Sequence, residues 1–316
     1  MSASQRQNPA SGPKRPPSSG PRRASPGRKP AAPRAGAAKA RKPWSPLAAL
    51  AIGVAVMLGG GFGLRAALAA PIHVNLFHRL MTHLEDRHPG ALWHVVHGLC
   101  VRDMQLSGQP APCAKVDLAA GYAVIKDVQR RTQFLLVPTR RIVGIESPQL
   151  LAADAPNFWA DAWSARDLVS RQVGHDLPRE DIGLAVNSVP GRTQNQLHIH
   201  IDCVRPDVVD KLRKRVDQVG PGWARLRGGL DGHPYRARWI DDAALADQDP
   251  FKLLAQDNPD ARADMGDQTL VLIGARRADG AAGFVLLNAQ ADPAHYDIAA
   301  GEWLLDHSCR VADQQT

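Results

Sequence analysis

The first 44 residues contain no aspartate or glutamate, although they hold eleven lysines and arginines. They also have almost no large apolar side chains and consist mainly of Pro, Ala, Arg, Ser and Gly. Such a segment cannot bury enough apolar surface to offset the entropy lost on folding, so we predict a disordered basic tail. Subtracting these eleven charges from the formal net charge of +8 leaves −3 for the rest. The basic balance therefore does not imply that the folded part binds nucleic acid.

Residues 47–64 lack any charged side chain. A helix of this length spans about 27 Å, which is close to the thickness of a bilayer core. We therefore expect a transmembrane anchor at residues 45–70. The basic tail before it predicts a cytoplasmic N-terminus and a folded part on the far side of the membrane. A buried core helix and a cleavable signal ending near Ala69 remain alternatives.

The sequence has no C-x-x-C motif, which argues against thioredoxin-like redox chemistry. Its four cysteines all follow the predicted span: Cys100, Cys113, Cys203 and Cys309. On an oxidising side of a membrane they are disulfide candidates, and four cysteines allow three pairings. We favour Cys100–Cys113, which closes a short loop, and Cys203–Cys309, which ties the central strand to the C-terminus. In a reducing compartment they would instead be buried thiols.

No P-loop, no dinucleotide-binding turn and no internal repeat occurs in the sequence. Short apolar runs separated by polar turns predict an antiparallel sheet with packed helices, that is, an α+β fold. The expected strands are residues 121–127, 133–138, 184–188, 196–203, 270–273 and 283–287. The expected helices are residues 157–173, 207–219 and 250–265, and a glycine-rich basic loop is expected at 225–238.

The segment 196–203 alternates strictly between polar and apolar residues, which is typical of a strand with one solvent-facing and one buried face. Its polar face carries Gln196, His198, His200 and Asp202. Two imidazoles therefore lie about 6–7 Å apart along this strand. The segment 190–195 before it is a turn rich in hydrogen-bond donors.

Three interpretations of the histidine pair are open. The side chains can be solvated surface residues. They can be zinc ligands with Asp202, but no Cys or Glu is placed to complete the three or four ligands that zinc requires. They can also include a nucleophile that attacks phosphorus, while the second histidine and the turn amides hold phosphate oxygens. Six further histidines occur in residues 71–98, which we interpret as part of a connecting helix at 71–99 and not as a metal site.

The histidine strand resembles the motif of the histidine-triad (HIT) superfamily, His-φ-His-φ-His-φ-φ with φ apolar. Gln196 stands at the first histidine and Asp202 at the last apolar position. A more specific resemblance, from about Cys100 to Cys309, is to the bacterial CDP-diacylglycerol pyrophosphatases. The stretches that carry it are residues 112–114, 121–122, 126–127, 137–139, 145–148, 156–158, 165–167, 187–188, 191–195, 198–201, 205–207 and 232–233.

This resemblance implies a HIT-like catalytic domain at residues 100–312, preceded by one N-terminal transmembrane helix. It implies hydrolysis of CDP-diacylglycerol to CMP and phosphatidate, without metal or cofactor and without a nucleic-acid partner. The protein would be a single-pass protein of a bacterial inner membrane with a periplasmic catalytic domain. His198 would attack phosphorus and carry the CMP adduct, and His200 would hold a phosphate oxygen.

The resemblance and the basic residues nearby also give candidates for substrate binding. Asp127 lies where the family contacts the ribose. Further candidates for the phosphates or the lipid headgroup are Asn187, Arg192, Thr193, Gln194, Gln196, Arg205 and His233, with Arg236 and Arg238 as weaker choices. In a shifted frame, His200 is the nucleophile and Asp202 the third member of the triad. The alternative functions are a membrane-anchored HIT-type hydrolase or nucleotidyl transferase for soluble nucleotide pyrophosphates, and an inactive nucleotide-binding module.

Overall fold

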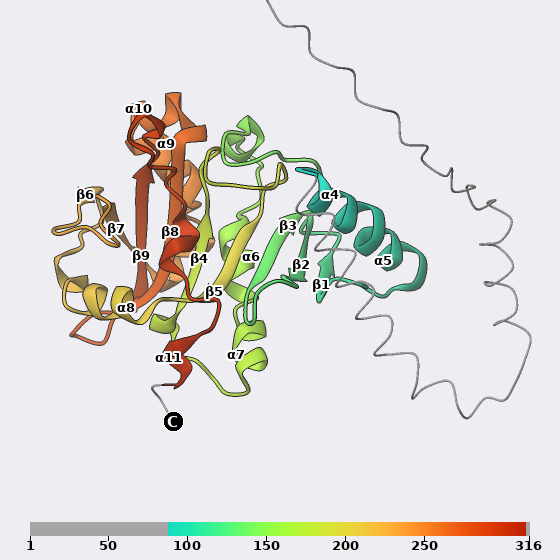
Figure 1. Ribbon diagram of the computed structural model, residues 1–316, viewed down its shortest axis with the longest axis horizontal. Coiled ribbons are helices and arrows are strands. Elements are labelled where there is room, and N and C mark those ends of the chain that lie inside the picture. Colours follow the sequence, from blue (N-terminus) through green and yellow to red (C-terminus); the bar gives the residue numbers. More distant parts are fainter. Residues whose placement is uncertain (1–87, 314–316) are drawn as a thin grey trace, which may run out of the picture. The chain divides into compact units, whose positions relative to one another are not determined.

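The computed structural model describes residues 88–313 (Figure 1). The predicted basic tail, the transmembrane anchor and most of the connecting helix lie outside the described residues, and so do His73, His78 and His83. Among residues 88–313, no helix has both the length and the apolar character needed to cross a membrane.

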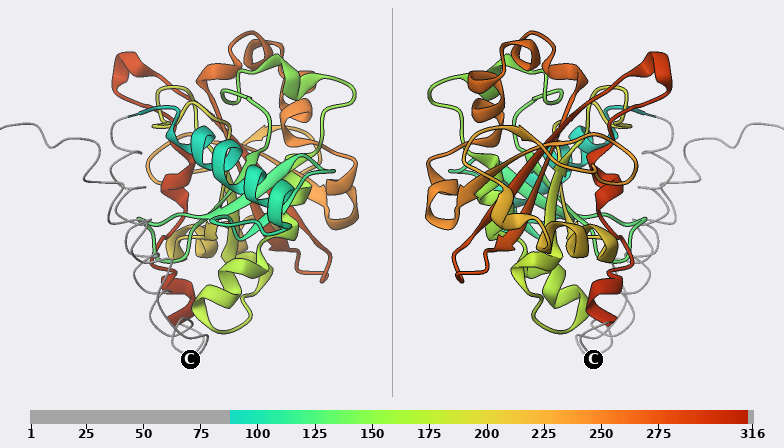
Figure 2. Two further views of the ribbon diagram at one scale, coloured as in Figure 1. Left: turned by 90° about the vertical axis from the view of Figure 1, so that its right-hand side faces the viewer. Right: turned by 90° about the vertical axis from the view of Figure 1, so that its left-hand side faces the viewer.

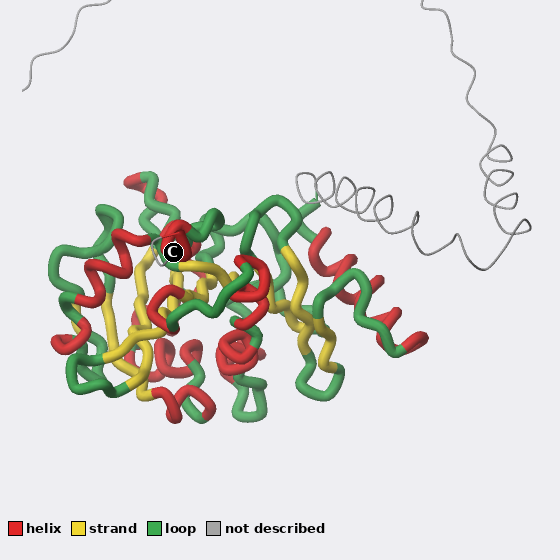
Figure 3. The backbone as a smooth tube through the Cα atoms, turned by 90° about the horizontal axis from the view of Figure 1, so that it is seen from below, coloured by secondary structure: helices red, strands yellow, loops and turns green. Residues whose placement is uncertain are grey.

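A nine-stranded antiparallel sheet forms the centre of this part of the chain, with strand order β1-β2-β3-β5-β4-β8-β9-β7-β6. Figure 3 shows its strands side by side with helices around them. The α+β class with an antiparallel sheet is confirmed. The strands are β1 Lys115–Asp117, β2 Tyr122–Lys126, β3 Phe134–Pro138, β4 Ile182–Val186, β5 Ile199–Cys203, β6 Ala224–Arg225, β7 Arg236–Asp241, β8 Gln268–Arg276 and β9 Ala282–Gln290.

Strands β2 and β3 are buried on both faces, which explains why their sequences are continuously apolar. Ala123 and Leu135 belong to a small core with the helical segment before β1, whereas Val124 and Leu136 belong to the main core. The period of two along a strand separates these two sets. The helical segment consists of α4 Ala91–Val95, a π-helical turn Val96–Val101 and α5 Arg102–Ser107, and it crosses one side of the sheet in Figure 2.

The helix expected at 157–173 is two helices, α6 Phe158–Ser164 and α7 Asp167–Val173. The guanidinium of Arg166 donates to the carbonyl oxygen of Trp163 at 2.9 Å. This is the carbonyl that a continuous helix would pair with the N–H of Asp167. A side chain therefore replaces the helical hydrogen bond at the break.

The helix expected at 250–265 also divides, into α9 Pro250–Asp257 and α10 Pro259–Ala263. Asn258 before the proline has φ −138° and ψ 94°, outside the helical region. Proline disfavours a helical conformation in the residue before it and cannot donate a backbone hydrogen bond. The side chain of Asn258 then accepts from the N–H of Ala261 and caps α10.

The third expected helix, 207–219, is α8 Pro206–Arg213 followed by a 3₁₀ turn at Val216–Gln218. A short helix α11, Arg310–Asp313, ends the described part. Disulfides join Cys100 to Cys113 and Cys203 to Cys309, which is the pairing favoured above. The first ties the π-helical turn to the loop before β1, and the second ties the end of β5 to the segment before α11.

Candidate active site

The alternation expected in the histidine strand is present, but its polar face is not solvated. Gln196 and Asp202 are fully buried, while His198 is 9% exposed and His200 is 6% exposed. The prediction of a solvent-facing side was wrong because other segments of the chain pack over this face of β5. Its polar face is covered by the loop after β2 and by residues 302–307, which contact it through hydrogen bonds.

The strand is also shorter than expected, because regular pairing with β3 begins only at Ile199, one residue after His198. In this register Leu136 lies opposite Ile199, and Pro138 ends β3. Proline has no N–H to continue the ladder. The side-chain amide of Gln196 instead donates to the carbonyl oxygens of Pro138, at 3.2 Å, and Arg140, at 3.0 Å.

His198 and His200 line a cavity of about 540 Å³. The other lining residues come from the start of the described chain, the β2–β3 loop, the turn before β5 and the C-terminal segment. They are His88, Pro89, Asp127, Gln129, Arg130, Gln133, Leu135, Thr193, Gln194 and Glu302. The histidine pair thus faces a cavity large enough for a small organic group and bordered by both positive and negative side chains.

The position of His198 determines which of its ring nitrogens is free. Its Nδ1 lies 2.7 Å from the backbone carbonyl oxygen of Gln196. A carbonyl oxygen only accepts, so Nδ1 carries the hydrogen and Nε2 carries the lone pair. Burial, followed by the neighbouring His200, lowers the pKa of His198 to about 4. The ring is therefore neutral at pH 7, the form in which a nitrogen is nucleophilic.

His200 has the opposite hydrogen arrangement. Its ring centroid is 4.8 Å from that of His198, and its Nδ1 lies 2.5 Å from the side-chain nitrogen of Gln133. Since this amide nitrogen donates, Nδ1 accepts and Nε2 carries the hydrogen. That Nε2 is buried and contacts no hydrogen-bond partner within residues 88–313. A buried N–H group without a hydrogen-bond partner is uncommon in folded proteins.

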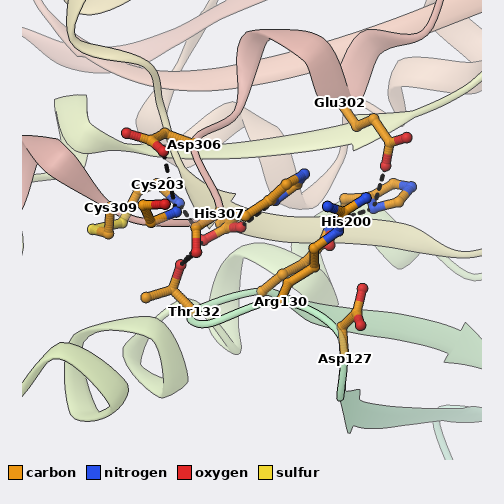
Figure 4. Close-up of polar contacts among 12 residues, drawn as sticks. Asp127, Arg130, Thr132, His200, Cys203, Glu302, Asp306, His307 and Cys309 are labelled. Atoms are coloured by element: carbon orange, nitrogen blue, oxygen red, sulfur yellow. Dashed lines mark hydrogen bonds and ion pairs between the residues drawn. A yellow bond between two sulfur atoms is a disulfide. The ribbon is translucent and has the colours of Figure 1, made fainter. Parts of the chain in front are cut away.

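Burial is the main reason why His200 stays neutral. Its pKa is lowered to about 3, first by burial and then by His307 and Arg130. Figure 4 shows Arg130 extending from the β2–β3 loop toward His200 and the carboxylate of Glu302 in contact with the ring. The Glu302 Oε2 atom is 3.3 Å from Nδ1 of His200. The cavity therefore has a fixed cation and a carboxylate beside two neutral imidazoles.

Asp202, the last polar residue of the strand, does not line the cavity. The Thr132 hydroxyl donates to its Oδ1 at 2.6 Å, and Nδ1 of His307 lies 2.8 Å from its Oδ2. Burial raises the pKa of Asp202, while these hydrogen bonds oppose the increase. Its carboxylate thus links β5 to two other segments. This arrangement does not favour the shifted frame, in which Asp202 would complete a triad.

The family model for CDP-diacylglycerol pyrophosphatase matches residues 87–313. The chain belongs to the CDP-diacylglycerol pyrophosphatase family. It is therefore an enzyme that hydrolyses CDP-diacylglycerol and acts in phospholipid metabolism. The match covers the whole described part of the chain, including the sheet, the histidine cavity and the C-terminal segment that closes one side of it.

Several residues predicted to bind the substrate of this pyrophosphatase lie at the cavity. Asp127, Thr193 and Gln194 line it, and the side-chain oxygen of Gln194 also accepts from the N–H of Leu92 at 3.1 Å. Asn187 lies just beyond β4, and its side-chain oxygen accepts from the backbone N–H of Glu302 at 3.1 Å. Asn187 therefore helps to position Glu302, which lines the cavity.

Four other predicted residues are not among those that line the cavity, and their side chains are engaged elsewhere. Gln196 holds the loop after β3, as described above. Arg192 forms a two-pronged ion pair with Glu146. The remaining contacts are Arg205 with Asp207 and Asp231, and His233 with Asp297. Of the weaker choices, Arg238 is 8% exposed and pairs with Asp257.

The cavity and the contacts beside it also involve residues that the sequence analysis missed. Arg130 and Gln133 lie in or beside the hairpin connection, which was interpreted only as a polar turn. Glu302 and His307 follow the last expected strand, where no periodic pattern draws attention to them. The proposed Cys203–Cys309 disulfide is the one signal that could have placed this segment beside β5.

The structure also bears on the zinc interpretation. Within residues 88–313, no group of three or more His, Cys, Asp or Glu side chains has a spacing that could hold a metal ion. Nδ1 of His198 is engaged with a backbone carbonyl, and Asp202 is held by Thr132 and His307. These contacts do not favour the zinc interpretation for His198 and Asp202.

Proposed function

We propose that this enzyme cleaves CDP-diacylglycerol through a nucleotidyl-histidine intermediate on His198. The observation that carries the proposal is the contact between Nδ1 of His198 and the carbonyl oxygen of Gln196. It fixes the tautomer and leaves the lone pair on Nε2, the ring nitrogen that is not hydrogen-bonded to the backbone. The low pKa of His198, about 4, keeps this lone pair available at neutral pH.

In the first step Nε2 of His198 attacks the phosphorus that carries cytidine. The new bond joins nitrogen to phosphorus, and the bond from that phosphorus to the bridging oxygen breaks. The electron pair leaves with the bridging oxygen, so phosphatidate departs as the leaving group. The imidazole, still protonated at Nδ1, becomes positively charged and holds CMP. Water then attacks the same phosphorus and releases CMP.

Two groups of the cavity can stabilise the negative charge of the reacting phosphates. Nε2–H of His200 is a buried donor without a partner in the described part of the chain. Arg130 lines the same cavity and supplies a permanent positive charge. Donors and cations that are positioned before the reaction stabilise charge that develops during bond transfer. We assign His200 and Arg130 to the phosphate oxygens and Asp127 to the ribose.

The experiment is to trap the adduct. The protein is mixed with CDP-diacylglycerol labelled in the cytidine, then denatured at alkaline pH, and the labelled peptide is identified. We expect the label on His198, no label with His198→Ala, and slower labelling of the same residue with His200→Asn. A label on His200 would contradict the assignment and favour the shifted frame. Dinucleoside and ADP-ribose-like substrates tested beside CDP-diacylglycerol measure the preference for the lipid nucleotide.

We further propose that residues 45–70 anchor this enzyme in a bacterial inner membrane, with the catalytic part in the periplasm. The uncharged stretch at 47–64 after a basic tail supports the anchor. The two disulfides support an oxidising compartment. The test is fractionation of the full chain and of a variant lacking 47–64, with protease protection in spheroplasts. Recovery of the full chain in the soluble fraction would contradict the proposal.

A further inference from the structure

The carboxylate of Glu302 lies in the catalytic cavity, although attack by His198 transfers no proton to it. Glu302 belongs to the 3₁₀ turn Gly301–Leu304, and its side chain is 24% exposed. A carboxylate beside a site that binds a negatively charged pyrophosphate weakens binding through like-charge repulsion. Its presence there therefore suggests a function in a step other than binding.

The turn that carries Glu302 is held firmly by the sheet. Its backbone N–H donates to the side-chain oxygen of Asn187 at 3.1 Å, and the N–H of Gly301 donates to the Thr269 hydroxyl oxygen at 3.1 Å. On the far side of the turn, the N–H of Arg205 donates to the Leu304 carbonyl at 3.0 Å. The carboxylate thus comes from a turn fixed to β4, β8 and the end of β5, and not from a free loop.

The contact between Glu302 and His200 leaves the carboxylate able to accept a proton. Nδ1 of His200 accepts from Gln133, so it presents a lone pair and not a hydrogen to the Oε2 atom 3.3 Å away. A lone pair facing a carboxylate oxygen does not satisfy that oxygen. The negative charge of Glu302 also favours positive charge on His198, since it opposes the lowering of the His198 pKa.

The second half of the reaction needs a group that can accept a proton. The positive charge that the His198 ring gains when Nε2 bonds to phosphorus is lost again in this half. The attacking water must lose a proton, and neutral His200, with a pKa lowered to about 3, is a poor acceptor. His198 cannot accept it at Nε2 while that atom is bonded to phosphorus.

We propose that Glu302 is the general base for the water that opens the nucleotidyl-histidine. The inference rests on the His198 route proposed above and assigns the proton in its second step. The water oxygen bonds to phosphorus, the phosphorus–nitrogen bond breaks with its electron pair returning to Nε2, and the water proton passes to Glu302. CMP and neutral His198 result, and Glu302 releases the proton to solvent through the cavity.

The test uses the full chain with Glu302→Gln, which keeps the shape and removes the basic carboxylate. Rapid mixing with CDP-diacylglycerol should release a burst of phosphatidate of about one equivalent per enzyme, with the CMP adduct accumulating on His198. Steady release of CMP should fall about 10²- to 10⁴-fold, the usual range for loss of a general base. Hydroxylamine, a nucleophile that attacks without first losing a proton, should discharge the adduct of the variant.

Asp127→Asn is the matched control, because Asp127 is the other carboxylate among the lining residues. It should raise KM without accumulation of the adduct. Glu302→Asp should restore part of the rate of adduct breakdown. Turnover of Glu302→Gln near the wild-type rate, or an equal slowing of adduct formation and breakdown, would overturn the assignment. If neither wild type nor variant forms an adduct while the wild type still releases CMP, the histidine route itself fails.

Discussion

Nδ1 of His198 lies 2.7 Å from the backbone carbonyl oxygen of Gln196, two residues earlier in the chain. This contact uses the backbone and not the side chain of residue 196. The glutamine side chain points elsewhere and donates to the carbonyls of Pro138 and Arg140. The orientation of the proposed nucleophile is therefore independent of which side chain occupies position 196, whereas the stability of the adjoining loop is not.

Because only the backbone of Gln196 contacts His198, Gln196→Ala should affect stability and not the chemistry at His198. The variant should lose about 1–3 kcal/mol of unfolding free energy, because the buried carbonyl of Pro138 and the partly buried carbonyl of Arg140 lose their donor. It should still form the labelled adduct on His198. Denaturant unfolding and adduct trapping, done on the same preparation, check both expectations. Complete loss of labelling in a folded variant would show that the glutamine side chain takes part in the chemistry.

The pH dependence of kcat/KM should reflect the low pKa of His198. A protonated Nε2 has no lone pair for attack, so activity should fall only as the pH approaches about 4. A solvated histidine would instead give an acidic limb near its ordinary pKa of 6.5. Initial rates from pH 3.5 to 7 at low substrate concentration distinguish these cases. An acidic limb near 6.5 would contradict a buried, neutral nucleophile.

The same two histidines make stability depend on pH. Their folded pKa values, about 4 for His198 and about 3 for His200, lie below the value of 6.5 expected in the unfolded chain. The unfolded state therefore binds more protons below pH 6.5, and stability is lost as the pH falls from 6.5 toward 3. The loss from His198 alone is about 3 kcal/mol.

This expectation is measured by following Tm from pH 7.5 down to 4 for the wild type and for His198→Asn. The variant has no group that titrates at position 198, so its Tm should fall less steeply between pH 6.5 and 4. Parallel curves for the two proteins would mean that His198 contributes nothing to the dependence. Other groups titrate in this range in both proteins, and comparison of the slopes removes their effect.

The Cys203–Cys309 disulfide should matter for activity as well as for stability. It joins the end of β5 to Cys309, shortly after His307 in the sequence, and it closes a sequence separation of 106 residues. Replacement of both cysteines by alanine should lower the unfolding free energy by about 2–4 kcal/mol. It should also lower kcat, because the segment that carries Glu302 loses a covalent tie to the strand.

The Cys100–Cys113 disulfide provides the comparison, since it ties the π-helical turn to a loop and closes a separation of only 13 residues. Its removal should destabilise the protein with a smaller effect on kcat. The two double variants can be compared by calorimetry and by steady-state rates at a temperature at which both are folded. Equal effects on kcat would argue against a special role for the Cys203–Cys309 disulfide in catalysis.

The sequence alone predicted the sheet well where local pattern is decisive. The strands at 121–127 and 133–138 appeared within a residue or two, because apolar runs between polar turns leave few other arrangements. The expected helix at 250–265 is divided by Pro259, which disfavours a helical conformation at Asn258. The break at Arg166 depends on a side-chain hydrogen bond that no periodicity reveals.

The identity and spacing of His198 and His200 were determined by the sequence, because alternation along a strand places every second side chain on one face. Tertiary structure decided that this face lines a cavity and is not a solvent-exposed surface. It also decided which nitrogen of each ring carries the hydrogen. Glu302, more than a hundred residues farther along the chain, reaches His200 only because the end of the chain folds back across β5. Contacts between residues so far apart depend on packing of the whole sheet, and local sequence preferences do not specify them.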